Sequence, residues 1–260
     1  MRSRYPYRPS ASDFSYSFGP GPITPVVKAL IIANIVGFVV TWLAMSTLNV
    51  DLRLVLGLSP RDIVPGFQIW RGLTYLFLHE NVLHLLFNML ALWMFGVEME
   101  RRWGSRYFLK YYFVCGVGAA VTVMILSALP FAVFSTLYKS VTVGASGAIY
   151  GVLLAFGLYF PTRPILMFFV FPVPAKYAVM IMGAMALYAS MGGGPGSDGV
   201  AHAAHLGGLV AGYLFLKGGR LHLMSELQYR VAKWRVNRIK RRFDVYEGGR
   251  RIDDVDRRVH

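Results

Sequence analysis

The sequence predicts an all-α membrane protein in which six transmembrane helices form one bundle and both termini lie in the cytoplasm. Composition is the first observation: 55% of the 260 residues are hydrophobic, 15% are charged, and the mean hydropathy is +0.48. A typical soluble domain is about 45–50% apolar and about 25% charged. The excess of apolar residues excludes a disordered chain and disfavours a water-soluble domain. The other two observations are a set of apolar segments and an asymmetric distribution of basic residues.

Six apolar segments are candidate spans, because a spanning helix needs about 20 mostly apolar residues. In chain order they cover residues 25–48, 83–97, 107–129, 144–160, 177–191 and 200–216. We expect a flexible cytoplasmic N-terminus over residues 1–22, a six-helix membrane domain over 23–218, and a basic tail over 219–260. No cleavable signal peptide is expected, because the first apolar run starts late and is too long.

The basic residues predict the orientation of these segments. With the N-terminus inside, 23 of the 27 Lys and Arg lie in inner segments and 4 lie in outer loops. Thirteen of the inner ones follow position 216, and without them the ratio is still 10 to 4. Positive residues favour cytoplasmic loops, so both termini are predicted to be cytoplasmic. Because the net charge of +14 is concentrated in the tail, no nucleic-acid partner is expected.

The basic tail is expected to be partly helical. Met224, Leu227, Val231 and Trp234 follow helical spacing, with Arg and Lys between them. Such a helix is suited to lie on anionic lipid. A soluble basic tail that only fixes the topology fits the same residues, and the sequence leaves both interpretations open.

The second span opens with two polar residues, which are costly in a membrane and mark function by default. His84 and Asn88 are four residues apart and therefore share one helix face. His79-Glu80 precedes them, but a zinc-protease helix needs His-Glu-x-x-His, and the spacing of five rotates the second histidine by about 140°. No metal site is therefore expected. The alternative role of His84 and Asn88 is a polar contact between helices.

The fourth span begins with a serine among small residues, Gly144-Ala145-Ser146-Gly147. This span is short: Ser146 to Pro161 is 15 residues, a rise of about 22 Å against a hydrocarbon core of about 30 Å. If Pro161 marks the inner interface, Ser146 lies about 8 Å below the outer one. Such a serine either serves helix packing or is a buried nucleophile.

The sixth span carries His202 and His205, followed by glycines. Positions 205, 208 and 212 share one face, and the fourth span offers a matching small surface at Gly147 and Gly151. Small residues let helix backbones approach closely in membranes. We therefore expect His205 to come within reach of Ser146.

In combination these segments resemble the rhomboid family of intramembrane serine proteases, from about Trp70 to Gly212. The resemblance is carried by Trp70-Arg71, His84-x-x-x-Asn88, Gly96-Val97-Glu98-x-Glu100-Arg101-x-x-Gly104-Ser105, Gly144-Ala145-Ser146-Gly147-x-x-Tyr150 and Ala204-His205-x-x-Gly208-x-x-x-Gly212. Each motif alone is weak, but all of them occur in order and in the matching spans. Six spans with no added helix are similar to the basic bacterial form, which implies a multi-pass protein of the bacterial plasma (inner) membrane.

The resemblance implies a catalytic dyad with Ser146 as the nucleophile and His205 as the general base. Tyr150 matches the ring that packs on the histidine, and Gly144, Gly147 and Gly208 are supporting positions. His84, Asn88 and the Ser146 backbone N–H match the oxyanion hole. No cofactor is implied.

Other residues receive secondary expectations. Asp198 is not expected to orient His205, and His202 is expected to be structural. Trp70 and Arg71 are expected to anchor the outer loop at the interface, and Glu98 and Arg101 to pair. The Gly-rich loop from Ser190 to Gly199 is expected to be a mobile cap, with the substrate gate beside the fifth span.

The predicted function is endoproteolysis of single-span transmembrane proteins near the outer face of the membrane. Two alternative functions fit parts of the same pattern. A catalytically silent relative would bind membrane helices as an adaptor, but such relatives lack the serine or the histidine. A small transporter predicts inverted repeats with broken helices, and the sequence has no such symmetry.

Overall fold

The computed structural model describes residues 20–130, 135–167, 170–190 and 199–218, and two short strands near the C-terminus. The chain divides into two units, Met1–Phe215 and Leu216–His260. In the second unit, β3 (Tyr246–Glu247) pairs antiparallel with β4 (Arg250–Arg251). The amphipathic helix predicted around residues 224–234 lies outside the described residues.

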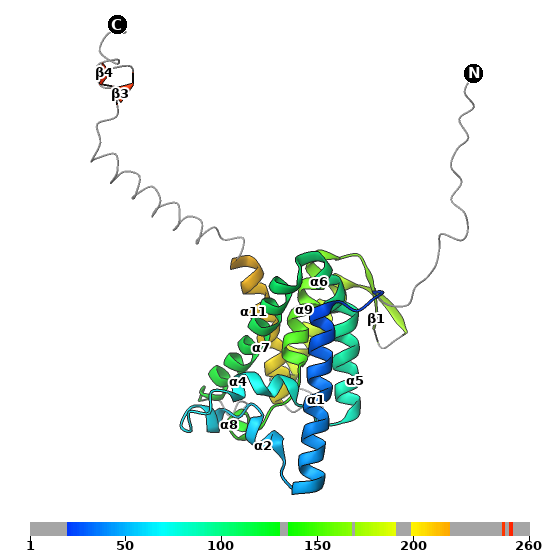
Figure 1. Ribbon diagram of the computed structural model, residues 1–260, viewed down its shortest axis with the longest axis vertical. Helices are drawn as coiled ribbons and strands as arrows, with labels where there is room; N and C mark the ends of the chain where they lie inside the picture. The colour runs from blue at the N-terminus through cyan, green and yellow to red at the C-terminus, as the bar shows by residue number, and fades with distance from the viewer. Residues whose placement is uncertain are drawn as a thin grey trace, which may run out of the picture. The chain divides into compact units, whose positions relative to one another are not determined.

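The first unit is a helical bundle. Its elements are α1 (Pro25–Leu48), α2 (Leu52–Leu56), α3 (Pro60–Ile63), α4 (Arg71–Thr74), η2 (Tyr75–Phe77), α5 (Val82–Ala91), η3 (Leu92–Gly96), α6 (Val97–Trp103), α7 (Ser105–Ser127), α8 (Ser135–Lys139), α9 (Ser146–Tyr159), β1 (Pro164–Met167), β2 (Phe171–Pro174), α10 (Ala175–Ser190) and α11 (Gly199–Gly218). Figure 1 shows α2, α4 and α8 at one end of the bundle, here called the loop end, and α6 and β1 at the opposite end, here called the hairpin end.

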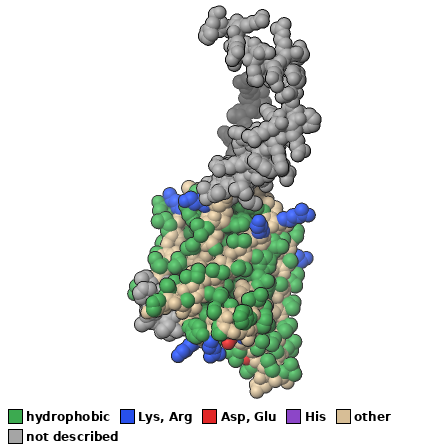
Figure 2. Space-filling model, turned by 90° about the vertical axis from the view of Figure 1, so that its left-hand side faces the viewer, with side chains coloured by type: hydrophobic (Ala, Val, Ile, Leu, Met, Phe, Trp, Pro, Cys, Tyr) green, Lys and Arg blue, Asp and Glu red, His purple; other side chains and the backbone are tan. Residues whose placement is uncertain are grey.

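Within the described residues, three helical runs are long and apolar enough to cross a membrane: α1, the continuous run from Val82 to Trp103, and α7. Two shorter apolar helices cover Ser146–Tyr159 and Ala175–Tyr188. On the face shown in Figure 2, Lys and Arg gather at two opposite rims, and mostly hydrophobic side chains cover the band between them. The described part of the chain is therefore a multi-pass membrane protein.

The second span is longer than the sequence predicted. We expected it to end near Val97, but the helix continues through the charged residues of α6 to Trp103. The charges are tolerated because each has an ionic, polar or aromatic partner at the hairpin end. The Glu100 carboxylate accepts hydrogen bonds from the Val26 and Val27 N–H groups, at 3.0 and 2.9 Å, and thereby caps the start of α1.

The predicted pairing of Glu98 with Arg101 is wrong. Glu98 pairs instead with Arg163, at 3.0 Å, and Arg101 donates to the carbonyl oxygens of Pro20 and Pro22. Both contacts join segments that are distant in sequence, so helical spacing alone did not reveal them. They fasten α6 to the chain entering α1 and to the turn after α9.

Trp70 and Arg71 differ in role. Trp70 is 48% exposed, whereas Arg71 is 4% exposed and holds the loop end together from within. The Arg71 guanidinium donates to the Gly57 carbonyl at 2.9 Å and lies 3.5 Å from Asp62. A hydrogen bond from Ser59 and the nearby arginines hold the pKa of Asp62 below its ordinary value. Arg71 therefore stabilises the loop from within, and anchoring at the interface stays a prediction for Trp70.

The helix α9 forms the centre of the bundle. Of its 14 residues, nine are buried: Gly147, Ala148, Ile149, Gly151, Val152, Leu153, Ala155, Phe156 and Gly157. It packs against α7, α10 and the α5–η3–α6 run. A helix that is buried on nearly every side holds its ends in fixed positions, and Ser146 is its first residue.

Candidate active site

The start of α9 is held in place by the loop end. The segment before it pairs with the loop, because the N–H groups of Leu58 and Thr142 each donate to the other residue's carbonyl, at 2.9 and 2.8 Å. The Gly144 N–H then donates to the Tyr75 carbonyl at 2.9 Å. Gly144 has φ +125°, a conformation that residues with a Cβ rarely adopt. These contacts fix where the chain turns into α9 and so fix Ser146.

Close packing of α9 and α11 brings the predicted serine and histidine together. A Cβ added at Gly208 would fall on the Gly147 carbonyl oxygen, and one added at Gly212 would lie 3.3 Å from the Gly151 Cα. The two helices can approach this closely only because the contact positions carry no side chain. At this separation His205 Nε2 lies 2.7 Å from Ser146 Oγ, a hydrogen-bond distance.

The His205 ring is held by a neighbouring aromatic ring. Tyr150, one turn after Ser146, stacks on it with the ring centroids 4.1 Å apart and the planes at 4°. His202 meets it edge-on at 5.6 Å. Within the described part of the chain, His205 Nδ1 has no hydrogen-bond partner. Asp198, which we did not expect to orient this ring, lies outside the described residues.

The other predicted pair, His84 and Asn88, surrounds the backbone just before Ser146. Asn81 caps α5 by accepting from the His84 N–H at 2.8 Å, which sets the first turn of the helix. A Cβ added at Gly144 would lie 2.9 Å from His84 Nε2 and 3.7 Å from Asn88 Nδ2. Asn88 is buried, and its amide nitrogen has no hydrogen-bond partner among the described residues. Two side-chain donors thus converge beside Ser146.

Two residues near the site were missed as contributors by the sequence reasoning. His79, which the sequence offers only as part of an incomplete zinc motif, is 1% exposed and meets the His84 ring edge-on at 5.0 Å. Tyr75 is also buried, and its hydroxyl donates to the Gly116 carbonyl of α7 at 2.7 Å. The signal for His79 was a histidine just before an apolar span; nothing in the sequence distinguished Tyr75 from other aromatic residues.

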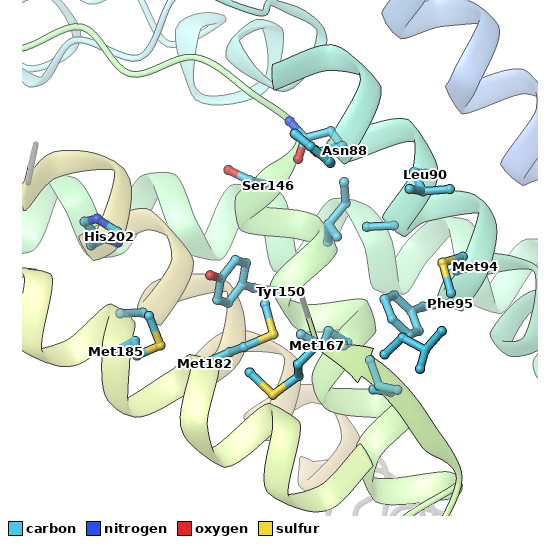
Figure 3. Close-up of a pocket in the computed structure, with 17 residues that line it drawn as sticks. Asn88, Leu90, Met94, Phe95, Ser146, Tyr150, Met167, Met182, Met185 and His202 are labelled. Atoms are coloured by element: carbon cyan, nitrogen blue, oxygen red, sulfur yellow. The ribbon is translucent and has the colours of Figure 1, made fainter. Parts of the chain in front are cut away.

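A cavity of about 520 Å³ opens beside Ser146. Figure 3 shows Ser146 and Asn88 next to each other at one end, with Tyr150 and Met182 farther in. Its walls come from α5 and η3, α9, β1, α10 and α11, and most of the lining is apolar. His202 lines it as well. The expected cap ran from Ser190 to Gly199, and its residues 191–198 lie outside the described residues.

The fold and the site define a multi-pass membrane protein with a serine–histidine pair inside its helical bundle. Residues 66–219 match the family model described as the Rhomboid domain, which is more than half of the chain. The chain belongs to the rhomboid family, and the resemblance inferred from the motifs is confirmed.

Three relatives illustrate the similarity. Rhomboid protease GluP of Bacillus subtilis (strain 168) is 29% identical over 165 residues, which cover 64% of this chain and 29% of the relative. RHOMBOID-like protein 2 of Arabidopsis thaliana is 29% identical over 187 residues, covering 72% and 53%. Rhomboid protease AarA of Providencia stuartii is 35% identical over 156 residues, covering 56% and 54%. The matched region is therefore about half of these relatives or less.

Proposed function

We propose that this chain is an intramembrane serine endopeptidase in which Ser146 is the nucleophile and His205 the general base. The observation that carries the proposal is the 2.7 Å contact between Ser146 Oγ and His205 Nε2 inside a helical membrane domain. A serine hydroxyl is a weak nucleophile unless a base within hydrogen-bond reach takes its proton. Neutral imidazole is suited to that task near neutral pH.

In the first half of the reaction, Ser146 Oγ attacks the carbonyl carbon of the scissile peptide bond, and its proton passes to His205 Nε2. The carbonyl oxygen becomes an oxyanion, which accepts hydrogen bonds from His84, Asn88 and the Ser146 N–H. The unpartnered Asn88 amide beside Gly144 supports this role. When the C–N bond breaks, His205 returns the proton to the leaving amine, and an ester to Ser146 remains.

In the second half, water attacks the ester carbonyl and gives a proton to His205. The C–O bond to Ser146 then breaks, and the proton returns to Ser146 Oγ. His205 thus acts as base and acid in each half, and the sum is hydrolysis of one peptide bond. Since the first turn of an α-helix has free N–H groups, the position of Ser146 as the first residue of α9 provides a backbone donor.

We propose six spans: α1, the α5–η3–α6 run, α7, α9, α10 and α11, with both termini on the cytoplasmic side. The membrane domain then covers residues 23–218, with residues 1–22 before it and a basic tail over 219–260. The excess of Lys and Arg in the segments assigned to the cytoplasm supports this orientation. In this orientation the loop end and Ser146 lie toward the outer face of the membrane. We propose that the protein lies in a bacterial plasma membrane. The basic tail is proposed to contact the anionic headgroups of its lipids.

The proposed substrates are single-span membrane proteins, which enter beside α10. The packing of α10 supports this entry. Near the hairpin end, a Cβ added at Gly157 of α9 would lie 2.7 Å from Val179, whereas one added at Gly183 farther along α10 would meet only Leu209, at 3.4 Å. The helix is therefore packed tightly near its start and more loosely beside the cavity. A substrate helix must unwind to expose a carbonyl to Ser146, because a hydrogen-bonded helix shields its carbonyls.

The test is labelling of the purified full chain with a fluorescent fluorophosphonate, combined with a helix-cleavage assay in lipid. We expect labelling and cleavage by the wild type and neither by Ser146→Ala, while His205→Ala reacts far more slowly. Ser127→Ala is the matched control, because the Ser127 hydroxyl only bonds a carbonyl of its own helix at 2.8 Å. A folded wild type that neither labels nor cleaves would overturn the proposal and favour the adaptor alternative.

A further inference from the structure

A second apolar groove lies on the other side of the bundle, between α7 and α11. It has a volume of about 630 Å³, and its lining includes Lys110, Val117, Gly118, Val121, Ala211 and Phe215. Neither Ser146 nor any other residue of the candidate active site lines it. Its floor is formed where Gly118 faces the Cβ of Ala211. The small residues let the helices touch there, and the larger side chains on either side form the walls.

The groove has one charged end. Lys110 is the only charged residue in its lining as the structure describes it, and the Lys110 Nζ lies 5.6 Å from the centroid of the Phe215 ring. Arg106 is exposed and lies four residues earlier in α7, so it shares the helix face of Lys110. Two cationic side chains thus lie at the hairpin end of an otherwise apolar groove.

The length of the groove fits one leaflet of a bilayer. From Lys110 to Val121 the helix rises about 16 Å, against a half-thickness of about 15 Å for the hydrocarbon core. A molecule that fits must carry an apolar chain of about that length and a negative charge at one end. Val117 and Val121 are 42% and 46% exposed, so the groove is accessible from the surface that faces lipid.

We propose that this groove is a binding site for one anionic phospholipid of the leaflet at the hairpin end. An acyl chain lies along α7 and α11 over the Gly118–Ala211 contact, and the phosphate lies between Lys110 and Arg106. Lys110 reaches the phosphate because a lysine bends its ammonium toward the interface while its methylene stem packs on apolar surface, here on Phe215. The site is separate from the proposed catalytic function and does not depend on it.

The test measures lipid binding to the full chain by native mass spectrometry in neutral detergent. Phosphatidylglycerol and phosphatidylcholine with identical acyl chains are compared. We expect Lys110→Gln to lower the affinity for phosphatidylglycerol about fivefold, equivalent to about 1 kcal/mol for a basic residue at an anionic surface, and to leave phosphatidylcholine binding unchanged. Lys176→Gln is the matched control, because Lys176 is exposed, lies next to an aromatic ring at 4.6 Å and does not line the groove.

A second pair of variants tests the apolar part. Val117→Phe fills the groove and should weaken the binding of both lipids, whereas Val39→Phe, at a position 43% exposed on α1, should weaken neither. The proposal is overturned if Lys176→Gln lowers phosphatidylglycerol affinity as much as Lys110→Gln does, because the lysines would then act only as general surface charge. It is also overturned if Val117→Phe leaves both affinities unchanged.

Discussion

The substitution Gly208→Ala tests whether the contact between α9 and α11 sets the distance within the proposed dyad. The added Cβ would fall on the Gly147 carbonyl oxygen and lie 2.7 Å from the carbonyl carbon, whereas carbon atoms in comfortable contact are about 3.5–4.0 Å apart. The Gly147 carbonyl is backbone, and a Cβ is fixed by the backbone of its own residue, so neither group can rotate away. The helices must therefore separate by at least about 1 Å at this point.

That separation acts directly on the reacting atoms. The Ser146–His205 contact of 2.7 Å would open to well beyond the reach of about 2.6–3.2 Å that general-base catalysis needs. A misplacement of about 1 Å lowers rates by about 100-fold, and the overpacking destabilises the fold by about 1–3 kcal/mol. We expect kcat in the helix-cleavage assay to fall about 100-fold, with slower fluorophosphonate labelling of Ser146 in protein that is still folded at the assay temperature.

Gly183→Ala provides the control. It makes the same change inside α10, where the added Cβ would meet only Leu209, at an ordinary contact distance of 3.4 Å. Alanine is favoured over glycine in a helix by about 0.5–1 kcal/mol, so this variant should be at least as stable as the wild type. The reasoning is refuted if folded Gly208→Ala cleaves and labels within about threefold of Gly183→Ala, a difference of less than about 1 kcal/mol.

Five further substitutions, at four positions, address single contacts. Asn88→Ala should lower kcat by about 10²–10³ with little change in KM or thermal stability, because it removes one proposed oxyanion donor. Tyr150→Phe, which keeps the ring stacked on His205, should retain most of the activity, whereas Tyr150→Leu should lower kcat. Arg71→Met should lower the free energy of unfolding by about 1–3 kcal/mol, measured by thermal denaturation, since it leaves buried carbonyl groups unpaired. Glu100→Gln should cost about 1–2 kcal/mol in the same measurement by removing the negative charge at the start of α1.

Each of these has an outcome that contradicts it. A large loss of thermal stability in Asn88→Ala would mean that the amide serves packing and not the oxyanion. Equal activity of the two Tyr150 variants would show that the stacked ring does not orient His205. Unchanged denaturation of Arg71→Met or Glu100→Gln would mean that water replaces the lost contacts.

The sequence predicted the helices that carry the site better than it predicted what holds them. Spacing alone placed His84 and Asn88 on one face and matched the small residues of α9 and α11. These patterns are local or repetitive: residues four apart lie on one face of a helix, and small residues at regular spacing let two helices pack closely. The β1–β2 hairpin was not predicted, although its register from Pro164–Pro174 to Met167–Phe171 is regular. Its prolines and apolar run resemble an ordinary loop followed by the next span.

Other features depend on partners far away in the chain. Glu98 had a basic residue three positions on, but it pairs with Arg163, which the fold brings closer. Arg71 was expected to anchor the outer loop at the interface, but it is buried, which charged side chains seldom are unless they are paired. The loop supplies its partners, Gly57 and Asp62, and no local pattern identifies them. Tertiary contacts of this kind become visible only when the elements are assembled.

Among the described residues, His205 is held by an aromatic ring and by Ser146, and no third polar group hydrogen-bonds to it. In a serine–histidine–aspartate triad, a carboxylate holds the imidazole in one tautomer and one direction. Here the described residues offer Nδ1 no partner, and the parallel ring of Tyr150 restricts the tilt of the imidazole. Stacking leaves the ring free to turn in its own plane, and among the described residues the 2.7 Å contact with Ser146 is what restricts that rotation. Since α11 carries the histidine and α9 carries both of its restraints, the glycine contact between these two helices determines whether the pair can form at all.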